Sequence, residues 1–329
     1  MSAVKNLFVL YTGGTIGMLQ SAQGLAPAGG FEARMREHLA SQPTAPALDF
    51  TFAEMLPLLD SANMTQAQWL AMRDVIVDAV REGGHDAVLL LHGTDTLAYS
   101  AAALSFQLLG LGVPVVLTGS MLPAGAEGSD AWPNLCGALA ALAAGVAPGV
   151  HLWFNGALMH GARVSKLYSE ALDAFTVLPR PRHGEHAPVP AELGFAVRRQ
   201  PVNLAVVPLF PGLQAAHLRA LLGSGVQGLL LECYGSGTGP SDNAELLQVL
   251  REARQRGVVL AAISQCPAGH VEFGVYAAGS QLAASGLVSA GGMTREAALA
   301  KLFALIGAGL DAEATERWFA LDLCGERAE

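Results

Sequence analysis

The sequence predicts an α/β protein: a mainly parallel sheet in an N-terminal domain, followed by a second, smaller α/β domain. In this 329-residue chain, hydrophobic residues make up 52% and charged residues 14%, and the apolar positions lie in short runs that suit buried strands. These runs alternate with helix-like segments, which is typical of βαβ units. The length favours two domains over one.

The first half of the chain shows the clearest alternation. Strand-like runs lie at residues 6–11, 48–52, 87–91, 113–118 and 151–155. Between them, the clearest helix is expected from about Gln66 to Arg81, where Thr65 and Gln68 have the spacing of a capping box. Its expected apolar face consists of Leu70, Val75, Ile76, Ala79 and Val80.

A segment rich in Pro, Arg and His interrupts this alternation, which then resumes. We therefore expect an N-terminal domain at 1–179, a linker at 180–201 and a smaller C-terminal domain at 202–329. The second domain is expected to contain strands at 203–209, 226–232 and 257–264, and helices at 244–256 and 294–306.

Composition argues against several classes of partner. A net charge of -9 disfavours nucleic acid, which is bound by clustered Lys and Arg. No apolar run reaches the roughly 18 to 20 residues that span a bilayer, and the N-terminus lacks a signal-peptide layout, so we expect a cytoplasmic protein without a membrane partner. Widely spaced cysteines predict neither a zinc site nor disulfides; they are Cys136, Cys233, Cys266 and Cys324.

A glycine-rich turn follows the first strand, in the stretch "YTGGTIG". Neither phosphate-binding pattern, G-x-x-x-x-G-K-[ST] or G-x-G-x-x-G, occurs there. The turn instead offers the hydroxyls of Thr12 and Thr15 at the carboxyl end of a strand, where parallel sheets place their ligands. Alternatively, these hydroxyls only satisfy nearby backbone groups.

A second cluster of polar residues, "HGTDT", follows the strand at 87–91. Between this strand and the helix that follows lie His92, Thr94, Asp95 and Thr96. An Asp and two Thr at this place could bind a small zwitterion or act on a water molecule. They could also simply cap the helix.

Two further segments are candidates. Asp60 and Ser61 precede a helix start that could receive a carboxylate. Lys166, in "GARVSKLYSEALDAF", is either a surface residue or, if the fold returns it to Asp95, a group that holds or relays a proton.

The pairing of "TGGTIG" with "HGTDT" resembles the bacterial-type L-asparaginase family, and "GSMLP", "SKLYSEALDAF", "YGSGTGP" and "MTREAALAKL" are similar to its cytoplasmic, type I branch. The resemblance covers nearly the whole chain and implies the asparaginase/glutaminase-like fold. It implies Thr15 as the nucleophile, Thr94, Asp95 and Lys166 as the proton-handling set, and a substrate site that includes Gly14, Asp60, Ser61, Thr94 and Asp95.

The implied reaction is hydrolysis of L-asparagine to L-aspartate and ammonia, without a metal or an organic cofactor. A Thr hydroxyl is a poor nucleophile unless a neighbouring base assists it, and an Asp and Lys pair can do so. Whether Thr15 forms an acyl-enzyme or Thr94 helps water to attack stays open. The resemblance also implies self-association as a homodimer or a dimer of dimers.

The chain departs from the family at two positions. Many relatives have a Tyr ten residues after the nucleophile, where this chain has Leu25, and we expect Tyr276 either to replace it, from a partner subunit, or merely to pack at a helix start. Some type I relatives have an allosteric Arg where this chain has Glu232, although Ser165 and Cys266 match residues expected there. We therefore expect no strong cooperativity of that kind.

Three alternative functions stay open at this stage. The protein could be a glutaminase-asparaginase of broader specificity, or a non-catalytic relative that binds asparagine or aspartate, as the loss of the Tyr at Leu25 suggests. The amide-releasing subunit of a tRNA-dependent amidotransferase is disfavoured, because it usually carries an extra N-terminal domain.

Overall fold

The computed structural model describes residues 4–21, 24–42 and 48–328, and it confirms the predicted two-part α/β fold. The chain divides into two compact units, Met1–Val177 and Leu178–Glu329. The expected linker at 180–201 falls within the second unit, so its role as a linker stays a prediction.

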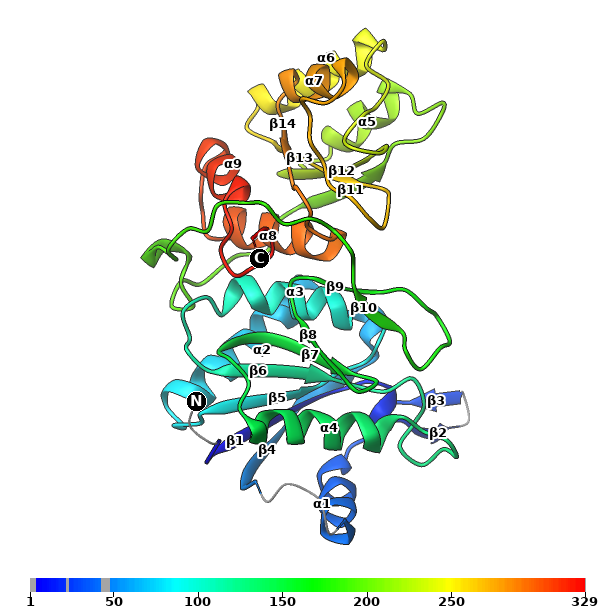
Figure 1. The fold of residues 1–329 in the computed structure, drawn as a ribbon, viewed down its shortest axis with the longest axis vertical. Helices are drawn as coiled ribbons and strands as arrows, with labels where there is room; N and C mark the ends of the chain where they lie inside the picture. The colour runs from blue at the N-terminus through cyan, green and yellow to red at the C-terminus, as the bar shows by residue number, and fades with distance from the viewer. Residues whose placement is uncertain (1–3, 22–23, 43–47, 329) are drawn as a thin grey trace. The chain divides into compact units, whose positions relative to one another are not determined.

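A six-stranded sheet forms the centre of the first unit, in the order β4-β1-β5-β6-β7-β8 (Figure 1). All neighbouring strands are parallel except β7 and β8. The strands are β1 (Leu7–Gly13), β4 (Phe50–Leu59), β5 (Ala87–Leu91), β6 (Pro114–Thr118), β7 (Gly149–Phe154) and β8 (Ala157–His160). β1 and β5 are fully buried, as expected for continuous apolar runs.

Helices cover both faces of this sheet. In Figure 1, α2 (Gln66–Arg81) and α3 (Leu97–Gln107) lie on one face, whereas α1 (Phe31–Ser41) and α4 (Ala131–Ala144) lie on the other. Because side chains alternate along a strand, Leu7 and Val9 of β1 share a core with α1 and α4. The capping box of Thr65 and Gln68 is present at the start of α2.

Two details differ from the sequence predictions. The strand expected at 48–52 begins at Phe50 and continues to Leu59, because β4 is an edge strand and an edge tolerates Pro57. In α2, only Ile76 of the expected apolar face is fully buried; the buried side centres on Trp69, Met72 and Ile76. These spacings of three and four residues also follow one helix face, and they place the larger side chains inward.

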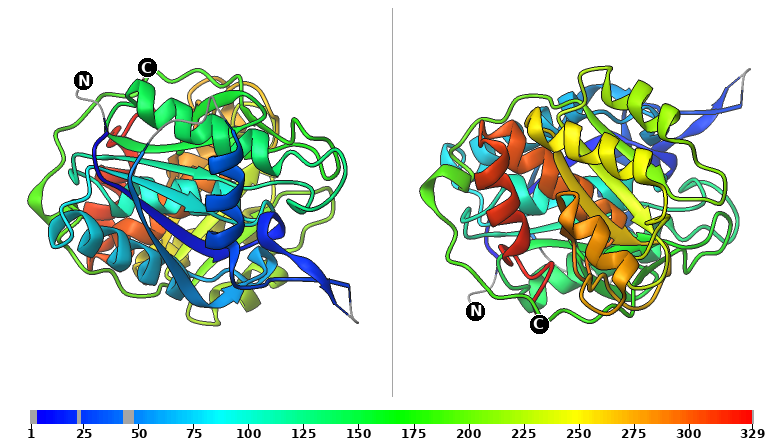
Figure 2. Two further views of the ribbon diagram at one scale, coloured as in Figure 1. Left: turned by 90° about the horizontal axis from the view of Figure 1, so that it is seen from below. Right: turned by 90° about the horizontal axis from the view of Figure 1, so that it is seen from above.

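Several short elements of the first unit were not predicted. β2 (Leu19–Ser21) and β3 (Gly24–Ala26) pair as a hairpin that projects away from the main sheet (Figure 2). β9 (Val164–Lys166) and β10 (Phe175–Val177) form a second antiparallel pair. Single 3-10 turns occur at η1 (Thr15–Gly17) and η2 (Ser61–Asn63), and in the second unit at η3 (Ala191–Leu193).

The second unit contains a parallel sheet in the order β11-β12-β13-β14. Its strands are β11 (Leu204–Pro208), β12 (Gly228–Cys233), β13 (Val259–Ser264) and β14 (Leu287–Ser289). Its helices are α5 (Ala215–Leu222), α6 (Ala244–Gln255), α7 (Ala277–Ala284), α8 (Arg295–Gly307) and α9 (Ala312–Ala320). The predicted strands and helices of this unit are confirmed to within about two residues at their ends.

Candidate active site

Three strand ends meet at one edge of the large sheet. β1 lies between β4 and β5 and is parallel to both, so the chain leaves all three strands at the same edge. The backbone N–H of Gly14 donates to the Leu59 carbonyl at 3.0 Å, and the Thr12 hydroxyl donates to the Leu91 carbonyl at 3.0 Å. The segments "TGGT", "DS" and "HGTDT", far apart in the sequence, are thereby brought together.

Glycines allow this close approach. Gly14 has φ +86°, and a Cβ added there would lie 2.3 Å from the backbone nitrogen of Gly93. A Cβ on Gly93 would in turn lie 2.5 Å from Oγ of Ser61. Any side chain at these positions would force the three loops apart.

The two threonines of the first turn have different environments. Thr12 is buried and its hydroxyl satisfies a backbone carbonyl, as the alternative interpretation of the motif expected. Thr15 begins η1 and is only partly buried. Among the residues that the structure describes, its hydroxyl has no hydrogen-bond partner, so it is available to a ligand.

Side-chain and backbone contacts hold the turn that carries Thr15. Arg34 of α1 donates to the Gly17 carbonyl at 3.0 Å, and the backbone N–H of Ala124 donates to the Ile16 carbonyl at 3.3 Å. The Tyr11 ring packs so closely under Gly17 that a Cβ there would lie 1.9 Å from its hydroxyl oxygen. Burial raises the pKa of Tyr11 to about 12, so its hydroxyl remains a neutral donor to the Ala28 carbonyl.

Lys166 returns to the second motif, as predicted. Its Nζ lies 3.0 Å from Oγ1 of Thr94 and 3.0 Å from Oδ1 of Asp95. Lys166 is the last residue of β9, and its side chain is 19% exposed, whereas that of Asp95 is 60% exposed. Thr94 is buried. The three polar groups are therefore arranged from a buried hydroxyl to a carboxylate that faces solvent.

Asp60 and Ser61 connect the third strand end to this set. The Asp60 carboxylate accepts from the Ala62 N–H at 3.2 Å and caps η2, while Ser61 is buried beside Gly93. The Thr96 hydroxyl donates to the Ser61 carbonyl at 2.8 Å. Thr96 is the N-cap residue of α3 but makes no side-chain cap bond, so the capping interpretation of this motif is wrong for Thr96.

A fourth loop, which follows β6, was missed by the sequence reasoning. The buried carboxylate of Asp130 accepts from the backbone N–H groups of Met121 and Leu122 at 2.9 to 3.0 Å. Asn134 donates to the Gly119 carbonyl at 3.0 Å. Gly119 touches the His92 carbonyl so closely that a Cβ would lie 2.2 Å away. The sequence signal that could have identified this loop is the pair of Asp130 and Asn134, four residues apart, after "GSMLP".

Leu25, which stands where many relatives have a Tyr, and its proposed replacement Tyr276 lie in different units. Leu25 is on β3 in the first unit and is 50% exposed. Tyr276 immediately precedes α7 in the second unit and is 60% exposed, so it is not packed at the helix start as the alternative interpretation expected. Its proposed catalytic role stays a prediction.

Glu232 is the next-to-last residue of β12 in the second unit, where it is buried and paired with Arg295. The Arg295 guanidinium donates to both carboxylate oxygens of Glu232, one of them at 3.0 Å. Nearby, the buried Arg180 donates to the Ser264 carbonyl at 3.2 Å and to the Cys266 carbonyl at 2.6 Å. The local charges are thus compensated within the chain.

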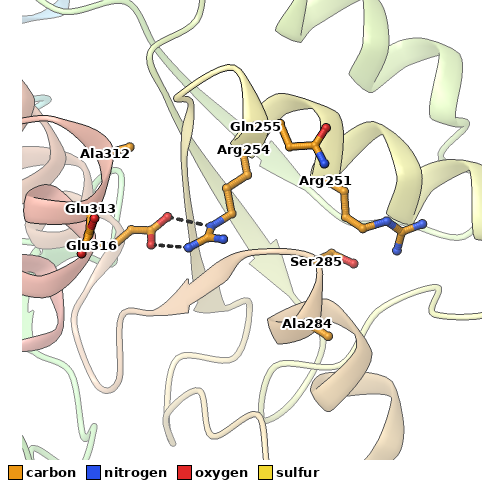
Figure 3. A pocket seen from close by; sticks show the side chains of 8 residues that line it. All are labelled: Arg251, Arg254, Gln255, Ala284, Ser285, Ala312, Glu313 and Glu316. Carbon is orange, nitrogen blue, oxygen red and sulfur yellow. Dashed lines mark hydrogen bonds and ion pairs between the residues drawn. The ribbon is translucent and has the colours of Figure 1, made fainter.

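A hollow of about 540 Å³ also lies in the second unit, bordered by α6, α7 and α9 (Figure 3). Arg254 crosses it to form two hydrogen bonds with the Glu316 carboxylate, at 2.8 and 3.0 Å. None of the predicted site residues lines it. Its central charges, those of Arg254 and Glu316, are paired with each other.

Membrane-spanning helices and metal sites, which the composition disfavoured, are also not found among the described residues. Within the described parts of the chain, no helix combines the length and apolarity that crossing a bilayer requires. The same residues contain no cluster of three or more His, Cys, Asp or Glu side chains that could hold a metal ion.

Comparison with known proteins places both units in described families. Residues 6–194 match the family model "Asparaginase, N-terminal", and residues 203–319 match "Glutaminase/Asparaginase C-terminal domain". The chain is 37% identical to L-asparaginase 1 of Escherichia coli K12, over 98% of each protein. It is 34% identical to a human 60 kDa lysophospholipase, over 98% of this chain and 61% of that protein.

Solved structures agree with these matches. L-asparaginase I from Vibrio cholerae superposes with a TM-score of 0.86 at 35% identity, over 99% of this chain and 100% of that one. At that level of identity, the agreement extends beyond the fold to the sequence of both units.

Proposed function

The chain belongs to the asparaginase family, and from that premise we propose that it hydrolyses L-asparagine to L-aspartate and ammonia. The observation that carries the proposal is the contact of Lys166 with both Thr94 and Asp95, on a loop that touches the Thr15 turn where Gly14 meets Gly93. A nucleophile, a proton-handling set and polar groups for a zwitterion lie at one sheet edge, where α/β proteins bind their ligands.

In the proposed reaction, an oxygen nucleophile attacks the side-chain amide carbon of asparagine. The carbon–nitrogen bond breaks, ammonia leaves, and water supplies the hydroxyl of the aspartate product. The nucleophile is the Thr15 hydroxyl, or a water that Thr94 activates. The proton that the nucleophile gives up passes through the set of Thr94, Asp95 and Lys166 to the leaving nitrogen, which therefore departs as ammonia. Backbone N–H groups of the strand-end turn stabilise the oxyanion.

The substrate's charged groups are assigned by chemistry. Asp95 is exposed and receives the α-ammonium group, while Ser61 at the start of η2 receives the α-carboxylate. Asp60 caps η2 through Oδ1, and as the neighbour of Ser61 it belongs to the proposed substrate site as well. Gly14 supplies close backbone approach. We propose that Tyr276 replaces the tyrosine that is absent at Leu25.

We further propose that the protein self-associates in the cytoplasm, as a homodimer or a dimer of dimers. Large apolar side chains are exposed in the segment that follows Lys166, namely Leu167, Tyr168 and Leu172. Burying them against a second copy would remove apolar surface from water next to the site. All four cysteines are free, which fits a reducing compartment.

Ammonia release from L-asparagine by the purified protein tests the activity. Thr15→Ala and Lys166→Met serve as controls and should lower kcat by about 100-fold or more, as expected when a nucleophile or proton-transfer group is removed. If the wild-type protein binds aspartate but releases no ammonia, it is a binding protein, and the enzymatic proposal is wrong.

A second candidate is a glutaminase-asparaginase. The exposed Leu25, in place of a Tyr, leaves open how closely the substrate side chain is enclosed. Comparison of kcat/KM for asparagine and glutamine separates the two candidates, because one additional methylene changes the positions of the polar groups as well as the fit.

A further inference from the structure

His92 is a buried residue of the "HGTDT" motif to which the proposed reaction gives no role. It follows β5 directly and is 0% exposed. Its Nδ1 lies 2.7 Å from the Gly93 carbonyl oxygen, and its Nε2 lies 2.8 Å from Oγ of Ser100 on α3. The Ser100 Oγ in turn lies 2.9 Å from the indole Nε1 of Trp69 on α2.

The donor and acceptor properties of these groups determine where each proton lies in this series of hydrogen bonds. An indole N–H can only donate, so the Ser100 oxygen accepts from Trp69. The Ser100 hydrogen is then free to be donated to Nε2 of His92. Burial lowers the pKa of His92 to about 4, so the ring is neutral and carries one proton. That proton must lie on Nδ1, from which it is donated to the Gly93 carbonyl.

Gly93 is the point where the strand-end loops touch. It lies against Ser61 and Gly14, and a peptide bond joins it directly to Thr94. Because the peptide unit is planar, the direction of the Gly93 carbonyl sets the orientation of the Gly93–Thr94 peptide. The Thr94 hydroxyl must then meet Lys166 at 3.0 Å.

We propose that His92 is a positioning residue: held in place by Ser100 and Trp69 on one side, it donates from Nδ1 to the Gly93 carbonyl, fixes the Gly93–Thr94 peptide and so aims the Thr94 hydroxyl at Lys166. This inference rests on the proposed function and assigns a role within the same site. A buried histidine that only satisfies its own hydrogen bonds would affect stability and leave turnover unchanged.

Ser100→Ala removes the donor to Nε2, so the ring is held only by its hydrogen bond to the Gly93 carbonyl and can tilt. We expect kcat for asparagine to fall about tenfold or more while KM stays within about twofold, because misplacement of a catalytic group by a fraction of an ångström acts on turnover. Ser105→Ala is the matched control. Ser105 is also buried on α3, but it donates to the Ala101 carbonyl of its own helix.

His92→Asn tests the same contact by rescue. The Asn side-chain N–H can replace Nδ1 as the donor to Gly93, so this variant should retain far more turnover than His92→Leu. Equal kcat values for Ser100→Ala and Ser105→Ala, or for His92→Asn and His92→Leu, would overturn the proposal.

The tautomer is measured without turnover, by nitrogen NMR of histidine-labelled protein at neutral pH. We expect the proton on Nδ1 of His92 in the wild type, and a shifted Nε2 resonance in Ser100→Ala, where Nε2 no longer accepts a hydrogen bond. A wild-type proton on Nε2 contradicts the inference even if the enzyme is active. Conversely, an inactive wild type contradicts the proposed function, while the spectrum still decides the state of His92.

Discussion

Lys166 donates a hydrogen bond to the hydroxyl of Thr94 at 3.0 Å, although 72 residues separate them in the chain. An ammonium group has only donors, so the Thr94 oxygen accepts here and the hydrogen of Thr94 points elsewhere. Thr94 can therefore receive a proton from a nucleophile only as its own proton moves on. The carboxylate of Asp95, at 3.0 Å from the same Nζ, stabilises the positive charge of Lys166.

Replacement of Thr94 by Val should abolish this transfer while the shape of the side chain is kept. We expect kcat to fall about 100-fold or more, since proton transfer by a positioned group contributes on the order of 100- to 10,000-fold. Thr96→Val is the comparison. The Thr96 hydroxyl holds the Ser61 carbonyl, so its loss should raise KM and change kcat less. Steady-state kinetics that give both variants the same kcat would contradict this assignment.

The neighbouring threonines of the first turn should separate stability from activity. Thr12→Val removes the buried hydrogen bond from the Thr12 hydroxyl to the Leu91 carbonyl, which costs about 1 kcal/mol of unfolding free energy. Thr15→Val should leave the unfolding free energy nearly unchanged, because the Thr15 hydroxyl has no partner among the described residues, yet remove turnover. Urea denaturation and ammonia release measure the two effects. A stability loss at Thr15 that equals the loss at Thr12 would contradict this prediction.

The meeting of "TGGT" and "HGTDT" could be predicted from sequence, because parallel strands of βαβ units release their loops at one edge of a sheet. Thr15, Thr94 and Asp95 each follow a continuous apolar run that periodicity alone identifies. The return of Lys166 to this edge depends on the short strands β9 and β10, which have three residues each and leave almost no periodic signal.

Other features depend on contacts that no local pattern encodes. Asp130 acts by accepting from the N–H groups of Met121 and Leu122, and backbone groups have no sequence signature. The tautomer of His92 depends on Trp69, which comes from another helix. Lys301, in a helix predicted from its spacing, is wholly buried with Glu326, although a lysine usually indicates a surface position.

Tyr276 gives a direct test of how this chain compensates for Leu25. We expect Tyr276→Phe to lower kcat by about tenfold or more if the hydroxyl acts on Thr15, since positioned acids and bases contribute at least that much. Val275→Ala, a change at the neighbouring exposed residue, is the control. An unchanged kcat in Tyr276→Phe would contradict the proposal that Tyr276 takes the role of the Tyr absent at Leu25.

Glu232 should prevent allosteric binding of asparagine of the kind that an Arg at this position supports. Its carboxylate is already paired with Arg295, and its negative charge repels the carboxylate of a ligand. We therefore expect a hyperbolic dependence of rate on asparagine concentration. A sigmoidal curve that becomes hyperbolic in Glu232→Gln or Cys266→Ser would show that the site is present after all.

Acid should destabilise the protein in two separate pH ranges. Burial lowers the pKa of His92 from 6.5 to about 4, so the unfolded chain binds a proton between these values and the folded protein does not. The stability that depends on neutral His92 is therefore complete above about pH 6.5 and is lost as the pH falls towards 4. A shift of this size corresponds to about 3 kcal/mol.

Asp322 should act at lower pH. Burial alone would raise the pKa of its carboxyl group, but hydrogen bonds from His186 and from the N–H groups of Arg327 and Ala328 outweigh burial and lower the pKa to about 2. Its contribution is thus present above about pH 4 and disappears as the pH falls through 2.

Urea denaturation from pH 7 to pH 4 checks the His92 prediction, with His92→Asn as the matched variant. Asn keeps a donor to the Gly93 carbonyl but does not titrate, so its unfolding free energy should fall less over this range than that of the wild type. Other ionisable groups act in both proteins, and their contributions cancel when the two curves are subtracted. The difference should therefore be concentrated between pH 6.5 and 4, and parallel curves for the two proteins would contradict a buried, neutral His92.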